Sequence, residues 1–217
     1  MTRMLKNTVA LSLLLTVCLS VLRCTPVYAS DNEAIPSSYD NPTIVISEPM
    51  TYEEMAEHFA QENGVEYSTA FRTLYPDLYK ITSKRLSARR AAKTRELSVY
   101  LNVTSGYRPH IAFYCNTDES GNYWGITSIY YVTLVRNYNG RVFQYSGVLQ
   151  AWLRSPYQIE YVVNGDFYYY ATQTVEASVS GGFGIGDMIY VEGQVGSSVS
   201  SNHLRYFYQH QTASFQS

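Results

Sequence analysis

Residues 122–170 have the sequence NYWGITSIYYVTLVRNYNGRVFQYSGVLQAWLRSPYQIEYVVNGDFYYY, in which two Asn-Gly pairs separate long runs of β-forming residues. Asn-Gly is the preferred pair for a two-residue type I′ turn, because both central positions of that turn need a positive φ angle. Asn139-Gly140 therefore predicts one β-hairpin, and Asn164-Gly165 predicts a second. Two hairpins in series indicate an antiparallel meander at the centre of the fold.

The first predicted turn would also set the register of the two strands that it joins. Tyr138 would lie opposite Arg141. Counting back along both strands from this pair places Leu134 opposite Tyr145. Side chains alternate between the two faces of a strand, so every second residue shares a face with these two. That face is the more apolar one, and we assign it to the core.

Strand signals continue to the end of the chain. Segments rich in β-formers alternate with Gly, Asn and Ser, which is typical of an all-β domain. We predict an antiparallel β-sandwich of about eight strands, preceded by a short α-helical hairpin, and assign residues 96–217 to this Tyr-rich domain. The predicted strands cover residues 97–104, 109–116, 122–138, 141–154, 157–163, 167–180, 186–199 and 203–215.

The first 29 residues have the pattern of a secretory signal peptide. Arg3 and Lys6 precede an apolar stretch, and Val27 and Ala29 supply small residues at the −3 and −1 positions of a predicted cleavage site after Ala29. We therefore expect a secreted, extracellular protein, with an organisation common among small secreted bacterial proteins. Residues 30–50 are polar and contain three prolines, which predicts a flexible leader.

Residues 51–95 are predicted to form a helical segment followed by a basic linker. Thr51 and Glu54 have the spacing of a capping box, and Asn63-Gly64 is typical of a helix end. A second helix is expected over residues 66–74, and Pro76 ends it or starts a further helical turn.

Residues 80–95 carry lysine and arginine throughout and no acidic residue. One interpretation is a solvated linker. The other is a protease processing site at the dibasic pairs that end in Arg85 and Arg90, which would make the helical segment a propeptide.

Charge and cysteine content narrow the function classes. The net charge is −2, and removal of the basic signal peptide makes the remainder more acidic, so nucleic acid is not an expected partner. Only Cys115 would remain after that removal, and it alternates with Ile111 and Phe113. A buried free thiol is therefore expected, with no internal disulfide.

No catalytic, cofactor or metal-ligand motif stands out. His58, His110, His203 and His210 have no paired-ligand spacing, so we predict no metal site and no cofactor. We expect a non-enzymatic protein; the remaining enzymatic hypothesis is a hydrolase assembled from scattered acids and histidines such as Glu160 and His203.

The chain contains 22 tyrosines, and tyrosine suits both half-buried sheets and contact surfaces. Packing within the sheets explains many of them. We also predict that aromatic rings bind a carbohydrate, a cell-wall polymer or another cell-surface ligand, because rings stack on sugar faces. The candidate binding residues are Tyr123, Trp124, Trp152, Tyr168, Tyr169 and Tyr170.

Residues 172–201 support an alternative. Small polar and apolar residues alternate around the glycine-rich segment SGGFGIGD, as in a hairpin that inserts into a membrane. Together with the basic linker, this pattern defines a second hypothesis, a protease-activated β-pore-forming toxin or bacteriocin-like effector. A membrane is an expected partner only under this alternative.

Overall fold

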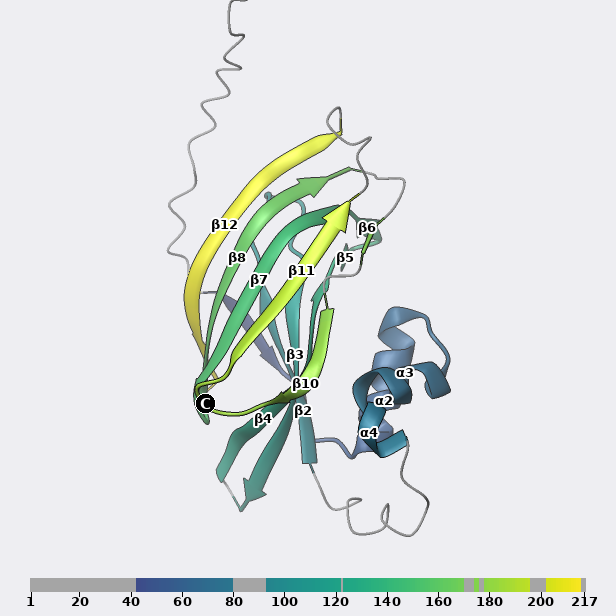
Figure 1. Ribbon diagram of the computed structural model, residues 1–217, viewed down its shortest axis with the longest axis vertical. Coiled ribbons are helices and arrows are strands. Elements are labelled where there is room, and N and C mark those ends of the chain that lie inside the picture. Colours follow the sequence, from purple (N-terminus) through teal and green to yellow (C-terminus); the bar gives the residue numbers. More distant parts are fainter. Residues whose placement is uncertain are drawn as a thin grey trace, which may run out of the picture. The chain divides into compact units, whose positions relative to one another are not determined.

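The computed structural model describes residues 42–79, 93–121, 123–169, 174–175, 178–195 and 202–215. All of them belong to one unit of the chain, Asn41–Ser217. The unit is mainly β, with two five-stranded antiparallel sheets that share a hydrophobic core and a short helical region before most of the strands (Figure 1). This arrangement confirms the predicted fold class, with more strands than the expected eight.

The strands order themselves as β1-β2-β3-β4-β10 in the first sheet and β12-β8-β7-β11-β9 in the second. The first sheet contains β1 (Thr43–Ile46), β2 (Lys93–Tyr100), β3 (His110–Ser120), β4 (Tyr123–Val135) and β10 (Ser178–Phe183). The second contains β7 (Gln144–Ser155), β8 (Gln158–Tyr168), β9 (Thr174–Val175), β11 (Met188–Val195) and β12 (His203–Ser214). A small ribbon pairs β5 (Asn137–Tyr138) with β6 (Arg141–Val142), and the helices are α2 (Tyr52–Asn63), α3 (Tyr67–Leu74) and α4 (Pro76–Tyr79).

The central strands of the first sheet are buried on both faces. In β3, Ile111 and Phe113 point into the core between the sheets, whereas Ala112 and Tyr114 belong to a second hydrophobic cluster under the helices. An apolar run without alternation is what a strand covered on both sides requires. The helices therefore form a third layer, on the side of the first sheet that faces away from the second (Figure 1).

The second sheet is buried on one face only. Along β8 the burial alternates strictly, with Ile159, Tyr161 and Val163 inside and the residues between them at least partly exposed. The same alternation runs along β12. No described residue forms a layer over the outward face of this sheet.

The helical segment forms as predicted. The Thr51 hydroxyl accepts a hydrogen bond from the Glu54 N–H, and the Glu54 carboxylate accepts one from the Thr51 N–H, which completes the capping box. Gly64 ends α2 in the left-handed conformation, with φ 63°. Helix α3 begins within a residue of its predicted start, and Pro76 opens α4.

The first predicted hairpin is only partly correct. Asn139 and Gly140 have φ angles of 52° and 76°, as a type I′ turn requires, and Tyr138 pairs with Arg141. However, the pairing ends at Asn137, because β4 and β7 belong to different sheets. The expected pairing of Leu134 with Tyr145 is therefore wrong.

The predicted core face of these strands is nevertheless correct at both residues. Leu134 and Tyr145 are both buried in the common core, which they enter from opposite sheets. Alternation along a strand determines which side chains face the core. It does not determine whether a second strand is hydrogen-bonded to the first in one sheet or packs against it from the other sheet.

The second predicted hairpin is wrong. Asn164 and Gly165 lie in the middle of β8, and the chain turns instead at Pro156 and Tyr157, between β7 and β8. Gly165 pairs with Gly147 of β7, and the ring of Tyr145 lies over this pair. Glycine is needed here for space, because a Cβ atom on Gly165 would lie 2.5 Å from the Ser146 carbonyl oxygen.

The structure also differs from the boundaries that were predicted near the start of the β-domain. Residues 43–46, expected in the flexible leader, form β1 and pair with β2. Strand β2 begins at Lys93, so the expected boundary between residues 95 and 96 falls inside a strand. The predicted signal peptide and the processing positions Ala29, Arg85 and Arg90 lie outside the described residues.

Two further expectations concern Cys115 and residues 172–201. Cys115 is a fully buried free thiol, as predicted, and burial raises its pKa well above the usual value. Within residues 172–201, β9 pairs with the end of β11, but β10 pairs with β4 of the first sheet and β11 with β7 of the second, so the described part is not one continuous hairpin.

We expect Gly165→Ala to destabilise the fold by about 1–3 kcal/mol, because the added methyl group overlaps the backbone of β7. Urea unfolding would measure the loss. Gly182→Ala is the matched control, since a Cβ atom at Gly182 meets no atom within 4 Å. Equal stability of the two variants would contradict the proposed role of Gly165.

Candidate functional site

The described tyrosines differ in what their rings contact. Most rings pack against other aromatic rings; for example, Phe59 contacts Tyr114 and Tyr131 at centroid distances of 5.4 and 5.5 Å. In contrast, Tyr190, Tyr206 and Tyr208 contact no other aromatic ring of the described chain and are about half exposed. Packing therefore accounts for most of the rings and leaves these three unexplained.

These three tyrosines all lie on the outward face of the second sheet. Tyr206 and Tyr208 project from the edge strand β12, and their exposed fractions are 54% and 57%. Met188 and Tyr190 project from β11, on the far side of β8 and β7, with exposed fractions of 54% and 47%. We call this surface the outward aromatic face.

Polar and apolar side chains fill the space between the two aromatic edges. The register places Asn164 of β8 beside Tyr208, and Gln150 of β7 beside Tyr190. The hydroxyl of Tyr206 donates a hydrogen bond of 2.9 Å to the Asn164 side-chain oxygen. This bond ties the ring to the neighbouring strand and restricts its rotation.

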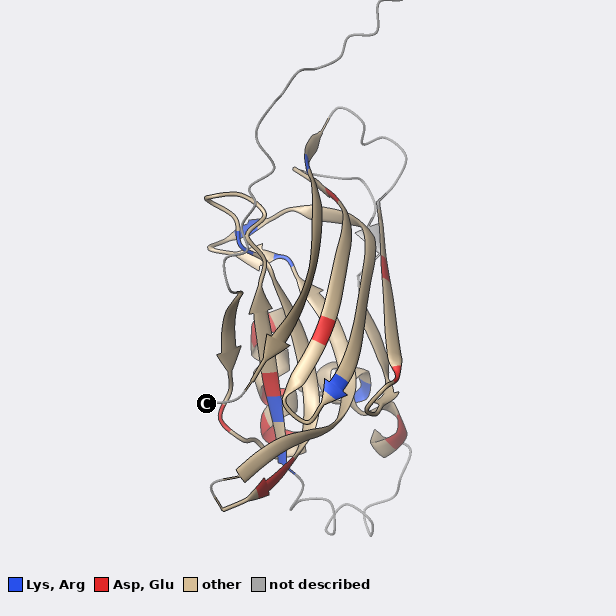
Figure 2. Ribbon diagram, turned by 90° about the vertical axis from the view of Figure 1, so that its left-hand side faces the viewer, with Lys and Arg blue, Asp and Glu red and all other residues tan. Residues whose placement is uncertain are grey.

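Most charged groups of the outward aromatic face are paired, and the exception is Glu192 of β11, whose carboxylate accepts a hydrogen bond from the Gln194 side chain. Glu160 accepts a hydrogen bond from Arg154 and lies 2.7 Å from a ring nitrogen of His210. Asp166 forms a similar pair with His203, also at 2.7 Å. Figure 2 shows the strands mostly in tan, with isolated acidic and basic positions. The face therefore lacks a large field of one sign.

The predicted binding residues do not gather at one place. Trp152 and Tyr168 are on the outward aromatic face, but Trp152 pairs with Glu160 and Tyr168 is eight residues further along β8. At about 3.3 Å per residue this separates them by about 26 Å. Arg154 lies over the Trp152 ring, and the Tyr168 ring contacts His203.

The remaining predicted residues lie elsewhere. Tyr123 and Trp124 both contact Tyr157, at the end of the β3–β4 hairpin, and Arg95 covers the Trp124 ring. Tyr169 is half exposed and contacts Phe143. Tyr170 lies outside the described residues.

The binding residues predicted from the sequence do not include Tyr190, Tyr206 and Tyr208, although the sequence of β12 contains a pattern that could have indicated two of them. In HLRYFYQHQTAS, residues 203–214, Tyr206, Tyr208 and His210 alternate with residues that turn inward. A strand with one solvated face shows this period of two. Without knowledge of which sheet carries a covering layer, the sequence could not show that this face stays open.

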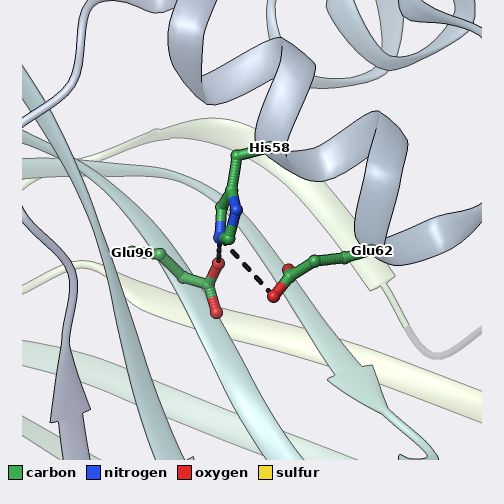
Figure 3. A group of neighbouring side chains, drawn as sticks. All are labelled: His58, Glu62 and Glu96. Carbon is green, nitrogen blue, oxygen red and sulfur yellow. Dashed lines mark hydrogen bonds and ion pairs between the residues drawn. The ribbon is translucent and has the colours of Figure 1, made fainter.

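A second group of side chains lies between α2 and the first sheet. His58 and Glu62 are one helical turn apart on α2, and both face Glu96 of β2 (Figure 3). The His58 Nε2 atom lies 2.9 Å from Glu96 Oε2 and 3.5 Å from Glu62 Oε1. Glu96 is almost fully buried, whereas His58 and Glu62 are about one third exposed.

The second oxygen of Glu96 has its own partners. The Ser98 hydroxyl donates a hydrogen bond of 2.6 Å to Glu96 Oε1, and His110 Nε2 lies 4.0 Å from the same atom. The two oxygens are thus distinguished, with Oε1 held by the sheet and Oε2 presented to the helix. Directly across the β2–β3 ladder, the Tyr114 hydroxyl is buried without a hydrogen-bond partner among the described residues.

The pKa values of these side chains shift because the ionisable groups lie close together and are partly buried. Burial and the nearby Glu96 raise the pKa of Glu62 to about 7. Hydrogen bonding to Glu96 raises the pKa of His58. Burial favours the protonated form of Glu96, but hydrogen bonds from His58 and Ser98 outweigh it and lower the pKa. Burial lowers the pKa of His110.

His58, Glu62 and Glu96 are also the described residues that could hold a metal ion, since their ligand atoms all lie within 4.8 Å of one another. This outcome differs from the expectation of no metal site, because no two histidines have paired-ligand spacing and Glu96 is 38 residues from His58 in the sequence. The His58–Glu62 spacing of four residues on a helix was the available signal.

The chain matches no protein-family model, no curated protein and no solved structure. Among the described residues, no helix has the length and apolar character needed to cross a membrane.

We expect Glu62→Gln to change how stability depends on pH in a buffer that contains a metal chelator. Because the pKa of Glu62 is about 7 in the folded protein against an ordinary value of 4.5, the folded state binds more protons between these values. The free energy of unfolding of the wild-type protein therefore falls as pH rises from 4.5 to about 7. Glu62→Gln does not titrate at this position, so its free energy of unfolding rises relative to that of the wild type over the same range. The full shift corresponds to about 3 kcal/mol, and partial exposure reduces the expected gain to about 1 kcal/mol.

Urea unfolding at about pH 4 and about pH 8 would measure this difference, because the two values bracket the window between 4.5 and about 7. Glu57→Gln, which removes an exposed acid from the same helix, is the matched control. Parallel pH profiles of wild type and Glu62→Gln would show that the environment of Glu62 is not as described.

Proposed function

We propose that this protein is a secreted, non-enzymatic β-sandwich that binds a carbohydrate polymer of a cell surface on its outward aromatic face. The observation that carries the proposal is the open face itself, on which Tyr190, Tyr206 and Tyr208 are exposed with rings free of aromatic contacts. Exposed large side chains gathered on one face are a recognised mark of a binding surface.

The size of the face favours an extended ligand. Tyr208 and Tyr190 stand on strands separated by three strand spacings, which corresponds to about 14 Å. Ligand contact with both edges would therefore need a molecule that crosses β8 and β7. A polymer of sugar rings has this reach, and a single small molecule does not.

The chemistry of the face favours an uncharged polar ligand. Aromatic rings offer flat apolar surfaces to the carbon–hydrogen faces of sugars, and the nearby amides of Asn164 and Gln150 can both donate and accept hydrogen bonds. The acids Glu160 and Asp166 are already paired with basic side chains. A strongly charged partner would find no complementary field here.

The rigidity of the aromatic side chains also favours ligand binding on this face. The aromatic side chains project from paired strands rather than from loops, and tyrosine has few rotatable bonds. Little conformational entropy is therefore lost when a ligand orders them. The hydrogen bond from Tyr206 to Asn164 restricts one ring in advance.

We expect Tyr208→Ala and Tyr190→Ala each to weaken binding to the recognised polysaccharide about tenfold, which corresponds to about 1.4 kcal/mol. The measurement is sedimentation with insoluble cell-wall and glycan preparations, followed by affinity electrophoresis on soluble ones. Tyr79→Ala is the matched control, because Tyr79 is as exposed as Tyr208 but lies on α4.

Two results would argue against the proposal. Binding that survives the double variant Tyr190→Ala/Tyr208→Ala would place the ligand elsewhere, for example at Tyr123 and Trp124. Absence of binding by the wild-type protein to every preparation would reject a carbohydrate partner.

The pore-forming alternative gains no support from the arrangement of residues 172–201. Its described strands β10 and β11 are hydrogen-bonded into two different sheets, so membrane insertion would first have to break both ladders. It stays a prediction that dye release from liposomes, before and after light trypsin treatment, would test.

A further inference from the structure

We infer that His58, Glu62 and Glu96 form a binding site for one divalent transition-metal ion, with Zn²⁺ as the representative ion, that fastens α2 to the first sheet. This site lies on the helix-covered side of the first sheet. The outward aromatic face belongs to the second sheet, so this inference does not depend on the proposed function.

The distances between the ligand atoms fit a coordination sphere. Zinc binds imidazole nitrogen and carboxylate oxygen at about 2.0–2.2 Å, so two ligands of one ion lie about 3.0–3.5 Å apart for angles between 90° and 109°. The His58 nitrogen lies 2.9 Å from the Glu96 oxygen and 3.5 Å from the Glu62 oxygen. All three ligand atoms lie within 4.8 Å of one another, so an ion would draw the side chains closer together.

The donor set selects the class of ion. One imidazole and two carboxylates suit Zn²⁺, Mn²⁺, Fe²⁺ and Co²⁺, whereas Ca²⁺ and Mg²⁺ favour sites made of oxygen alone. Three protein ligands also leave a position for water. The exposed sides of His58 and Glu62 give solvent, and an ion, access to that position.

The surroundings of Glu96 hold it in the orientation that a ligand needs. Ser98 donates to Oε1, and His110 lies near the same atom, so Oε2 is the oxygen directed at His58. Hydrogen bonds from neighbouring residues to a ligating carboxylate orient it and strengthen metal binding.

Such an ion would connect two layers of the molecule. His58 and Glu62 belong to the helical layer, and Glu96 belongs to the sheet that this layer covers. Because the site needs the folded arrangement of both layers, ion binding stabilises the folded state in proportion to affinity and concentration.

The test uses the purified chain, treated with chelator, freed of it and titrated with ZnCl₂, MnCl₂ or CoCl₂. We expect one equivalent of Zn²⁺ per chain to bind by isothermal titration calorimetry, and the thermal midpoint to rise with ion concentration. Glu62→Gln and His58→Gln should each weaken binding at least tenfold, and Ser98→Ala by about 10–100-fold. Visible absorption of bound Co²⁺ gives an independent signature of the coordination geometry.

His203→Gln is the matched control, because His203 pairs with one carboxylate on the surface and has no third ligand. It should bind Zn²⁺ like wild type. The metal-free variants should melt cooperatively, which excludes misfolding as the cause of any loss. Absence of saturable binding, or wild-type affinity in both Glu62→Gln and His58→Gln, would overturn the inference. Since the ion lies away from the outward aromatic face, polysaccharide binding in chelator tests the proposed function separately.

Discussion

The packing of Phe59 against Tyr114 and Tyr131 joins the helical layer to the first sheet, with ring centres 5.4 and 5.5 Å apart. These rings sit in a cluster of buried residues separate from the core between the sheets. The first sheet must consequently carry apolar side chains on both faces, and this constraint explains the unbroken apolar runs of β3 and β4. The second sheet has no such layer among the described residues, so its outer face can carry polar and exposed aromatic groups.

The same covering layer creates an electrostatic problem at Glu96. A carboxylate this deeply buried is costly unless it is paired and hydrogen-bonded. His58 from above and Ser98 from the strand provide those partners, and α2 brings Glu62 to the same place. A second acid beside a buried one is unfavourable without a cation or a proton. Two acids and a histidine therefore lie together between α2 and the first sheet, although apolar side chains alone could pack the helix against the sheet.

The tyrosines illustrate how one residue type serves two purposes. In the interior, rings such as Tyr107, Tyr114 and Tyr145 supply large apolar volume, and several hydroxyls reach backbone carbonyls. On the outward aromatic face, Tyr190 and Tyr208 have no neighbouring ring to contact. Composition alone cannot separate these populations, because the same side chain satisfies both environments. Topology separates them, since it decides which sheet is covered.

Local chemistry made several features predictable from the sequence. The capping box of Thr51 and Glu54, the helix end at Gly64 and the type I′ turn at Asn139 each depend on residues close together in the chain. Alternation likewise identified Tyr145 as a core residue, and the mainly β sandwich class followed from such patterns.

Only the tertiary structure decided which strands pair and which residues meet. β4 pairs with β3 and β10 rather than with β7, and Gly165 lies in a strand because it faces Gly147 closely, not because the chain turns there. His58 and Glu96 are brought together from segments 38 residues apart. A period of two in the sequence determines on which face of a strand a side chain lies, but it does not determine which strand pairs with it. Contacts between segments distant in sequence depend on how the layers stack. The sequence by itself therefore determined the local elements and the fold class, and the stacking of layers determined both candidate sites.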